Sequence, residues 1–483
     1  MNHRRFFLLQ TVMVCLLTGF YLVVAPARGQ VPSKENQEPH PGFFIIHKIT
    51  ITGNKITRPR IITRELKFRE LDTIPAAGFR QLLVTSRQNV FNTGLFNFVT
   101  IDTASADNRQ LIDIHISVVE RWYIWPIPLL EISERNFNIW WETRDFRRLT
   151  YGIDFTFNNF RGRNETLRLL AHFGYNQLYG FSYKIPNLNR KQTIGLTVGA
   201  GIEMNHEMTV QTLNNRTVNV KDSAYIKRII YGYSDMQLRP SFHTTHTFRL
   251  SYNYYIFSAN IDTVPGFSLS GSHQQWFLAV SYLFRNDHRD AAYYPLTGYY
   301  FELELNHTFP YGSAHNSYIK TKLKKYWQLL HRVYFATGFT GKVSFEKYQP
   351  YFLQRGLGYS QDFVRGYEYY VVDGQHFALI KSDLKFALVP QRVIKIGFIK
   401  TTKFNTIPLA LYLDLFADIG YCYNYQRLIQ SNKIQGNTLE NSLMEGIGLG
   451  INFATYYDVV FRFEGSINRM GKTGFALHFA SPI

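Results

Sequence analysis

The chain has 483 residues, a formal net charge of +18 and 16% aromatic residues, with 33 Tyr and 40 Phe. Hydrophobic residues reach 45%, yet the mean hydropathy is −0.19, so apolar and polar residues are interleaved. This disfavours a bundle of membrane-spanning helices, because each such helix needs about 20 consecutive apolar residues. Lys and Arg are scattered rather than grouped, so we expect the positive charge to face anionic lipid headgroups and a wet interior. Nucleic acid is not an expected partner.

The N-terminus has the three parts of a secretory signal. A basic "MNHRR" precedes the apolar "FFLLQTVMVCLLTGFYLVVA", and "APARG" supplies small residues for cleavage before Gln30. We predict a signal peptide at residues 1–29, with an uncleaved anchor as the alternative. Cys15 lies inside this segment, so cleavage leaves only Cys422, which permits neither an internal disulfide nor a cysteine metal site.

Residues 30–42, "QVPSKENQEPHPG", read as a flexible leader. Residues 43–121 then predict a β-α-α-β-β domain. "FFIIHKITITGNK" is a strand ending at a turn, and "TRPRIITRELKF" is a helix with Thr57 at its cap. "AGFRQLLVTSRQNVFNTGLF" is a second helix, and "FVTIDTA" and "LIDIHISVVER" are two strands. The order of these segments resembles a POTRA domain, and an ordinary α+β domain is the alternative.

From Trp122 onward the residues alternate with a period of two. In "DVVFRFEGSI", for example, Phe461 and Phe463 alternate with Arg462 and Glu464. A soluble β-sandwich also alternates in this way. The number of such segments, the aromatic excess and the signal peptide together favour a transmembrane β-barrel.

The predicted fold is therefore mainly β: a transmembrane barrel over residues 122–483, preceded by one small α+β domain. Roughly 360 residues at about 22 per strand and turn predict about 16 antiparallel strands. The first and last strands of the barrel are expected at about residues 149–160 and 473–480.

Several motifs in this region follow one another in the order of a known family. "FNNFRGRNETL" contains an Asn-x-x-Gly turn, "NDHRDAAYYPLTGYYFELEL" an Asp-x-Arg and a Pro-x-x-Gly, and "LDLFADIGYCY" a Phe-x-Asp-x-Gly; "FVRGY" precedes the last of these. The motif residues are Asn159, Gly162, Asp287, Arg289, Pro295, Gly298, Val364, Arg365, Gly366, Tyr367, Phe416, Asp418 and Gly420. With the POTRA-like domain, they resemble the outer-membrane insertase and translocator superfamily that includes BamA and TamA, here with a single POTRA domain.

The resemblance implies a role for "FVRGY". In this family the Val-Arg-Gly loop folds back into the barrel lumen, and its arginine contacts acidic residues on the wall. That role carries over to Arg365, with Asp383 and Asp418 as wall partners and Gly366 permitting the sharp turn. A guanidinium suits this contact because it stays charged and its fork of donors matches carboxylates. Asp383 stands where the family usually has Glu, so its reach is shorter.

The resemblance also implies a function. We expect a protein of the outer membrane, with its POTRA domain in the periplasm, that assists the insertion and assembly of outer-membrane proteins. Expected partners are unfolded outer-membrane proteins, outer-membrane lipid, and periplasmic or lipoprotein assembly subunits. A polypeptide translocation pore and a passive channel are the alternatives. No Gly-x-Ser-x-Gly element or metal-ligand spacing is visible, so we expect no enzymatic activity, no cofactor and no metal.

Overall fold

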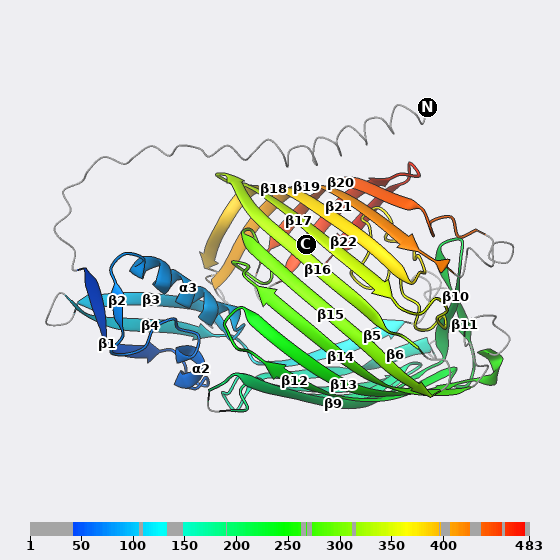
Figure 1. Ribbon diagram of the computed structural model, residues 1–483, viewed down its shortest axis with the longest axis horizontal. Helices are drawn as coiled ribbons and strands as arrows, with labels where there is room; N and C mark the ends of the chain where they lie inside the picture. Colours follow the sequence, from blue (N-terminus) through cyan, green and yellow to red (C-terminus); the bar gives the residue numbers. More distant parts are fainter. Residues whose placement is uncertain are drawn as a thin grey trace.

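The computed structural model describes residues 42–105, 110–132, 148–189, 191–261, 267, 273–311, 315–395, 397, 406–425, 436–455 and 459–478. The predicted signal peptide at 1–29 and nearly all of the predicted leader lie outside the described residues. A small α+β domain stands at one end of a large curled sheet (Figure 1). None of the helices in the described ranges is long and apolar enough to cross a membrane.

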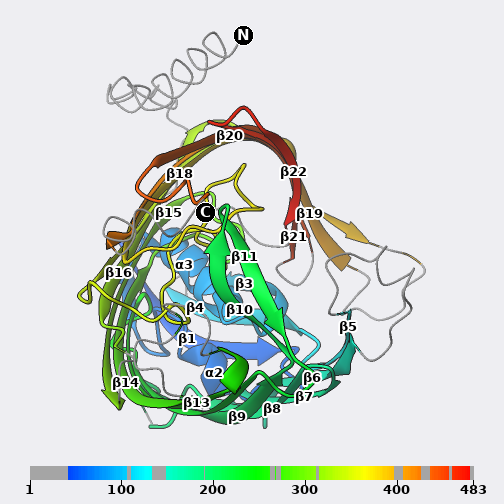
Figure 2. The ribbon, with the colours of Figure 1, turned by 90° about the vertical axis from the view of Figure 1, so that its right-hand side faces the viewer.

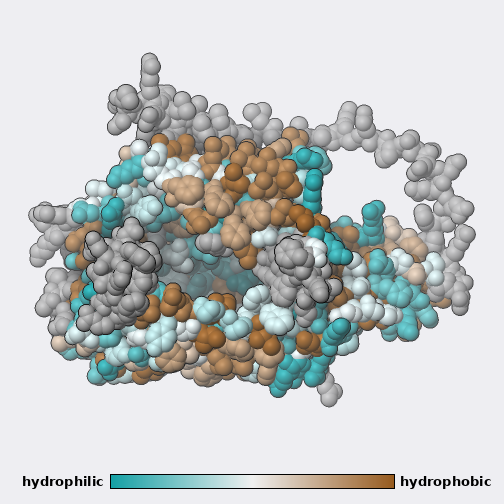
Figure 3. Space-filling model, turned by 180° about the vertical axis from the view of Figure 1, so that it is seen from behind, coloured by the Kyte–Doolittle hydropathy of each residue, from teal (hydrophilic) through white to brown (hydrophobic). Residues whose placement is uncertain are grey.

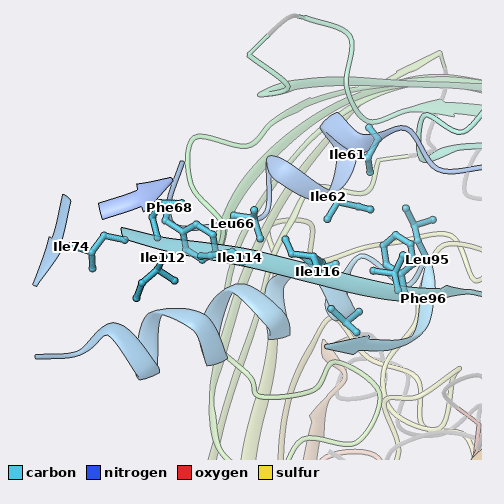
Figure 4. Close-up of a cluster of buried hydrophobic side chains, with 14 of the residues drawn as sticks. Ile61, Ile62, Leu66, Phe68, Ile74, Leu95, Phe96, Ile112, Ile114 and Ile116 are labelled. Atoms are coloured by element: carbon cyan, nitrogen blue, oxygen red, sulfur yellow. The ribbon is translucent and has the colours of Figure 1, made fainter. Parts of the chain in front are cut away.

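The small domain is a four-stranded sheet with the order β2-β1-β4-β3, in which β1 and β4 run parallel. Its elements are β1 (Phe43–Thr52), α2 (Pro59–Thr63), β2 (Thr73–Pro75), α3 (Phe79–Asn92), β3 (Phe96–Ser105) and β4 (Leu111–Glu120). Alternate residues of β4 are buried, and they include Ile112, Ile114 and Ile116. These isoleucines meet Ile62 and Phe96 in one apolar core (Figure 4). The predicted β-α-α-β-β order is therefore confirmed, with the short β2 added between the helices.

The prediction for Thr57 was wrong. The residue at the cap of α2 is Arg58, whose side chain makes no capping bond, and Pro59 occupies the first turn. Proline suits this position because its missing N–H would have no partner there. Thr57 is instead buried, and its hydroxyl points toward the large sheet.

The large sheet has 16 antiparallel strands and curls around a lumen (Figure 2). In chain order, the strands are β5 (Ile124–Ile132), β6 (Leu149–Phe160), β7 (Glu165–Gly174), β8 (Gln177–Ile185), β9 (Ile194–Asn205), β12 (Lys227–Leu238), β13 (Thr244–Phe257), β14 (Gln274–Asp287), β15 (Gly298–Tyr311), β16 (Tyr318–Leu330), β17 (Val333–Ser344), β18 (His376–Lys395), β19 (Thr406–Tyr423), β20 (Leu443–Ala454), β21 (Val460–Asn468) and β22 (Thr473–His478). The predicted fold class and strand number are confirmed. A separate hairpin of β10 (Glu207–Leu213) and β11 (Arg216–Lys221) and a short 3₁₀ helix at Ala259–Ile261 lie in the connections.

The alternation in sequence separates the side chains that face outward from those that face the lumen. On β13, Phe248, Leu250 and Tyr252 are exposed on the outer face, whereas Arg249 faces its ion-pair partner Asp235 on β12. Seen from behind, the molecule is hollowed, and hydrophilic side chains line the hollow beneath hydrophobic outer walls (Figure 3). An apolar outer face and a polar lumen are the pattern of a barrel in lipid.

The prediction for the first barrel strand was wrong. β6 covers residues 149–160 but is the second strand, because β5 precedes it and pairs with it from Ile124↔Phe157 to Ile132↔Leu149. The predicted last strand corresponds to β22. β5 and β22 are the two ends of the strand order, and no backbone pairing joins them within the described residues (Figure 2). β5 escaped notice because Pro126 and Pro128 interrupt it, and proline is rare inside sheets except in edge strands.

Candidate functional site

The candidate site is the long connection between β17 and β18, residues 345–375, which folds back into the lumen. Gly366 takes a φ of +91°, which favours glycine, and this turn aims the preceding side chain at the wall. The backbone at the turn is held from both sides. Glu368 accepts a hydrogen bond from the Gly366 N–H at 3.0 Å, and Asn468 on β21 donates to the Gly366 carbonyl at 2.7 Å.

Arg365 is 0% exposed and lies against two aspartates of the wall. Its Nε and Nη2 donate to Asp418 on β19 at 2.9 and 2.5 Å, and its backbone N–H donates to the same carboxylate at 3.0 Å. Nη2 also lies 2.7 Å from Oδ1 of Asp383 on β18. The ring of Phe416 lies below the guanidinium, 4.0 Å from its central carbon. The structure thus brings Arg365 together with Asp383, Asp418 and Phe416.

Further charged residues complete the cluster, and the sequence motifs did not assign them to it. Nη1 of Arg365 lies 3.7 Å from Glu464 on β21, and Glu464 pairs with Arg462 at 2.5 Å. Lys385 on β18 is buried 3.8 Å from Asp383. The alternation of "FRFEGS" places Arg462 and Glu464 on the lumenal face, but only the tertiary arrangement aims them at Arg365.

The charges in this cluster determine the pKa of Arg365. Burial by itself lowers the pKa of a guanidinium, because it removes water from the charged form. The negative charges of Asp383 and Asp418 outweigh that effect and hold the pKa of Arg365 well above its ordinary value. The guanidinium is therefore charged at every accessible pH.

Glycines in the wall make room for the loop. A Cβ on Gly446 of β20 would lie 1.8 Å from the Arg365 carbonyl oxygen, and one on Gly420 would lie 2.5 Å from the Val364 side chain. A Cβ on Gly448 would lie 2.4 Å from the Phe416 ring. Within the string "GIGLG" of β20, Gly446 therefore leaves room for the loop and Gly448 leaves room for the Phe416 ring, and sequence reasoning missed this feature. Its signal was the three glycines at alternate positions of one strand face.

The remaining loop residues form an apolar contact above the ion cluster. Val364 and Tyr367 are buried and pack in one cluster with other loop residues and with the ends of β18, β19 and β20. The partners of Val364 and Tyr367 in this cluster are Leu357, Val372, Phe377, Leu379, Cys422, Leu439 and Met444. The free thiol of Cys422 is thus a packing residue at this place.

The Asp-x-Arg and Pro-x-x-Gly motif lies elsewhere, in the turn between β14 and β15. Arg289 makes a two-pronged contact with Asp287, at 2.8 Å from Nε and 2.6 Å from Nη2. Gly298 has a φ of +104°, and a Cβ there would lie 2.1 Å from the His288 carbonyl oxygen. Pro295 is buried within the same turn. These residues shape the turn and do not belong to the Arg365 cluster.

Contacts at two places join the small domain to the barrel. The amide of Asn159 donates to the Thr57 hydroxyl at 2.8 Å, and Gly162 accepts from the Arg58 N–H at 2.9 Å. A Cβ on Gly162 would lie 2.0 Å from the carbonyl oxygen of Ile56, so the small domain packs closely against the Asn-x-x-Gly turn.

The second contact of this joint is an ion pair. Arg239, in the turn after β12, donates to both carboxylate oxygens of Glu65 at 2.8 and 2.9 Å. Glu65 is buried in the small domain, where it also pairs with Arg64 at 2.8 Å. The small domain is therefore attached at two points of the barrel mouth.

The lumen is covered at the end opposite the small domain. The β10–β11 hairpin reaches across the lumen in Figure 2. Asn214 and Asn215 at its tip have positive φ values of 51° and 58°, as a tight hairpin turn requires. The Asn215 N–H donates to Asn437 at 2.9 Å, and its carbonyl accepts from the Val371 N–H of the site loop at 2.9 Å. The hairpin tip is thus latched to the loop that carries Arg365.

The cluster holds the loop against the barrel wall. It consists of paired cations and carboxylates, and the described residues contain no group of His, Cys, Asp and Glu placed to hold a metal ion.

Comparison with known proteins places the chain in a family. The model of the Omp85 superfamily domain matches residues 159–456, more than half of the chain, and the POTRA model, described as surface antigen variable number repeat, matches residues 44–121. No curated protein sequence matches the chain significantly.

Among solved structures, BamA from Haemophilus ducreyi lacking POTRA domains 1–3 is similar, with 14% identity, a TM-score of 0.49, and coverage of 90% of this chain and 83% of that one. CdiB from Escherichia coli has 10% identity, a TM-score of 0.48, and coverage of 90% and 74%. CdiB from Acinetobacter baumannii has 13% identity, a TM-score of 0.46, and coverage of 91% and 74%. The family matches confirm the resemblance seen in the motifs: the chain belongs to the Omp85 superfamily and is an outer-membrane β-barrel protein with one POTRA domain.

Proposed function

We propose that this protein assists the insertion of other β-barrel proteins into the outer membrane, with its POTRA domain on the periplasmic side. The observation that carries the proposal is that β5 and β22, at the two ends of the 16-stranded sheet, are not paired with each other within the described residues. An unpaired strand edge in lipid is costly, because its N–H and C=O groups find no water there. An incoming strand of an unfolded outer-membrane protein would satisfy those groups by adding to the edge.

The composition of the two edge strands supports a weak closure. Within the described residues β22 is six residues long, so this part of the chain offers few ladder bonds to close the barrel. Pro126 and Pro128 remove two N–H donors from β5, and both donors would lie on the same side of the strand because the strand repeats every two residues. A seam with few bonds can open for a substrate without a large loss of free energy.

The locked loop supports an assembly role over a passive channel. The loop, the Arg365 cluster and the β10–β11 hairpin occupy the lumen and are held by buried ionic and amide contacts. A passive pore needs an open path, whereas a barrel that works at its seam can keep its lumen filled, and the loop docks on β18–β21, the strands beside the edge strand β22. The same features are compatible with a polypeptide translocation pore, which the experiment below separates.

The test uses the purified protein in liposomes. An unfolded outer-membrane protein is added, and its conversion to a protease-resistant, heat-modifiable band is followed over time. We expect faster folding with the full chain, and no acceleration after Arg365→Ala or after deletion of residues 43–121. Arg249→Ala is the matched control, because Arg249 is also a lumenal arginine paired with an aspartate but lies away from the loop.

Two results would contradict the proposal. One is unchanged substrate folding with the full chain together with transfer of an unfolded polypeptide into the liposome interior, which would indicate a translocation pore. The other is unchanged folding with a large ion conductance that Arg365→Ala does not alter, which would indicate a passive channel.

A further inference from the structure

The turn between β14 and β15 is longer than a barrel needs. The turn between β16 and β17 uses only residues 331–332, whereas this connection runs over residues 288–297. It is rigidly built: Asp290 accepts hydrogen bonds from the backbone N–H groups of Ala291 at 2.9 Å and Leu296 at 3.0 Å. The length and rigidity of this turn are explained by the side chain that it positions.

It carries Tyr294, which is 4% exposed and reaches the opposite wall of the lumen. Its ring lies 4.8 Å from the ring of Tyr412 on β19. Its hydroxyl accepts a hydrogen bond from Asn452 on β20 at 3.1 Å, and Asn452 also donates to Asp414 at 3.2 Å. The other buried residues of the same cluster are Ala387, Ala410, Ala454 and Val460. Tyr294, from the turn between β14 and β15, therefore packs on β18–β21, which lie three to six strands further along the sheet than β15.

The ring of Tyr294 also lies over a buried cation. Lys385 is 1% exposed, and within the described residues its Nζ has no hydrogen-bond partner. The ammonium lies 3.8 Å from Asp383 and 4.8 Å from the centre of the Tyr294 ring. A buried ammonium without hydrogen bonds is costly, and the face of an aromatic ring is one of the few neutral groups that stabilise it.

These contacts form a continuous path from the turn to the loop. Tyr294 covers Lys385, Lys385 pairs with Asp383, and Asp383 pairs with Arg365. If water reached Lys385, the ammonium could turn toward it, and Asp383 would lose the second cation that balances it. The distance between Asp383 and Arg365 therefore depends on what covers Lys385.

We propose that Tyr294 is a positioning residue for the lumenal loop: by covering Lys385 it holds Asp383 against Arg365 and so keeps the loop docked. This assigns a purpose to the Asp-x-Arg and Pro-x-x-Gly motif, which shapes the turn that delivers Tyr294. The proposal concerns the docking of the loop in the barrel itself. It stands whether the protein inserts, translocates or conducts.

The test measures loop docking directly. A nitroxide attached at Tyr369→Cys, a loop position with 72% exposure, reports loop mobility in the intact protein, and the buried Cys422 does not compete for the label. Tyr294→Ala is compared with Tyr294→Phe, which keeps the ring, and with Tyr252→Ala on the outer face of β13 as matched control. Each variant is also made with Lys385→Met, which removes the ammonium. Heat-modifiability confirms that every barrel is folded.

We expect Tyr294→Ala to raise the ratio of mobile to docked loop about 30-fold, the factor for a desolvated cation–π contact of about 2 kcal/mol. Tyr294→Phe should raise it far less, and Tyr252→Ala not at all. With Lys385→Met present, Tyr294→Ala should have little further effect, because no cation is left to cover.

Two results would overturn the proposal. The first is an unchanged spectrum in Tyr294→Ala. The second is an equal rise with and without Lys385→Met, which would show that Tyr294 acts only by filling space. If Tyr294→Ala gives no heat-modifiable barrel, Tyr294→Leu replaces it, since leucine fills most of the space without an aromatic face.

Discussion

Two arginines of the lumen make nearly the same contact in different surroundings. Arg365 contacts Asp418 through Nε and Nη2 at 2.9 and 2.5 Å, and Arg249 contacts Asp235 through the same two atoms at 2.6 and 2.8 Å. Arg365 is 0% exposed, whereas the Arg249 side chain is 49% exposed. Identical geometry therefore occurs once in a dry site and once in a wet one.

The difference comes from the loop. Residues 345–375 cover the wall of β18–β21, whereas Arg249 and Asp235 on β13 and β12 remain open to the lumen. A buried charge whose partner is removed has no water to replace it, but an exposed charge does. Burial rather than pairing geometry should then decide how much each arginine contributes to the stability of the protein. Four substitutions test this.

Arg365→Ala should have the largest effect. It strands Asp383 and Asp418 in a dry site, and breaking a buried pair in this way costs on the order of 3–5 kcal/mol. We expect a loop that no longer docks and a lower urea midpoint, with the 16 strands still assembled. The urea midpoint of the heat-modifiable band and the mobility of a label at Tyr369 measure both effects. An unchanged midpoint would mean that water reaches the site.

Gly446→Ala should come next. The new Cβ would lie 1.8 Å from the Arg365 carbonyl, which is backbone and cannot rotate away, so the loop must shift. Overpacking of this kind costs about 1–3 kcal/mol. Gly465→Ala on the neighbouring β21 is the matched control, because nothing lies within 4 Å of its Cβ. Equal urea midpoints for the two variants would show that the loop does not lie on β20.

Arg239→Ala should have a smaller effect, on the attachment of the POTRA domain. Glu65 loses a two-pronged partner but keeps Arg64, so we expect a loss of about 1 kcal/mol. Spin labels at the exposed Arg80 and Leu188 report the distance between domain and barrel. The distribution of label-to-label distances should broaden in the variant. An unchanged width would mean that the contact between Thr57 and Asn159 holds the domain without Arg239.

Arg249→Ala should have the smallest effect. Its exposed pair contributes roughly 0.2–1 kcal/mol, because water solvates Asp235 once the arginine is gone. Its urea midpoint should lie close to that of the unmodified protein and should approach it further in high salt. A loss as large as that of Arg365→Ala would refute the contrast between the two sites.

Part of this structure was readable from the sequence because it follows local rules. The period of two fixes which side chains face lipid, and it indicated the barrel. The strand number followed from the length of the region, roughly 360 residues at about 22 per strand and turn. The core of the small domain followed from the helical and strand periods. β5 was missed because two prolines obscure its alternation, and Thr57 was misassigned because its partners lie more than 60 residues away.

Within the site, the sequence determined the residue types. "FVRGY" contains the guanidinium and the glycine turn, and the alternation of β18, β19 and β21 places Asp383, Asp418 and Glu464 on the lumenal face. Only the tertiary structure decided that these three carboxylates converge on Arg365, that Gly446 of β20 leaves room for its backbone, and that Tyr294 crosses the lumen to cover Lys385. The physical reason is that each contact joins a loop or turn to strands elsewhere in the barrel, and a lumenal position becomes a buried one only when another segment folds over it.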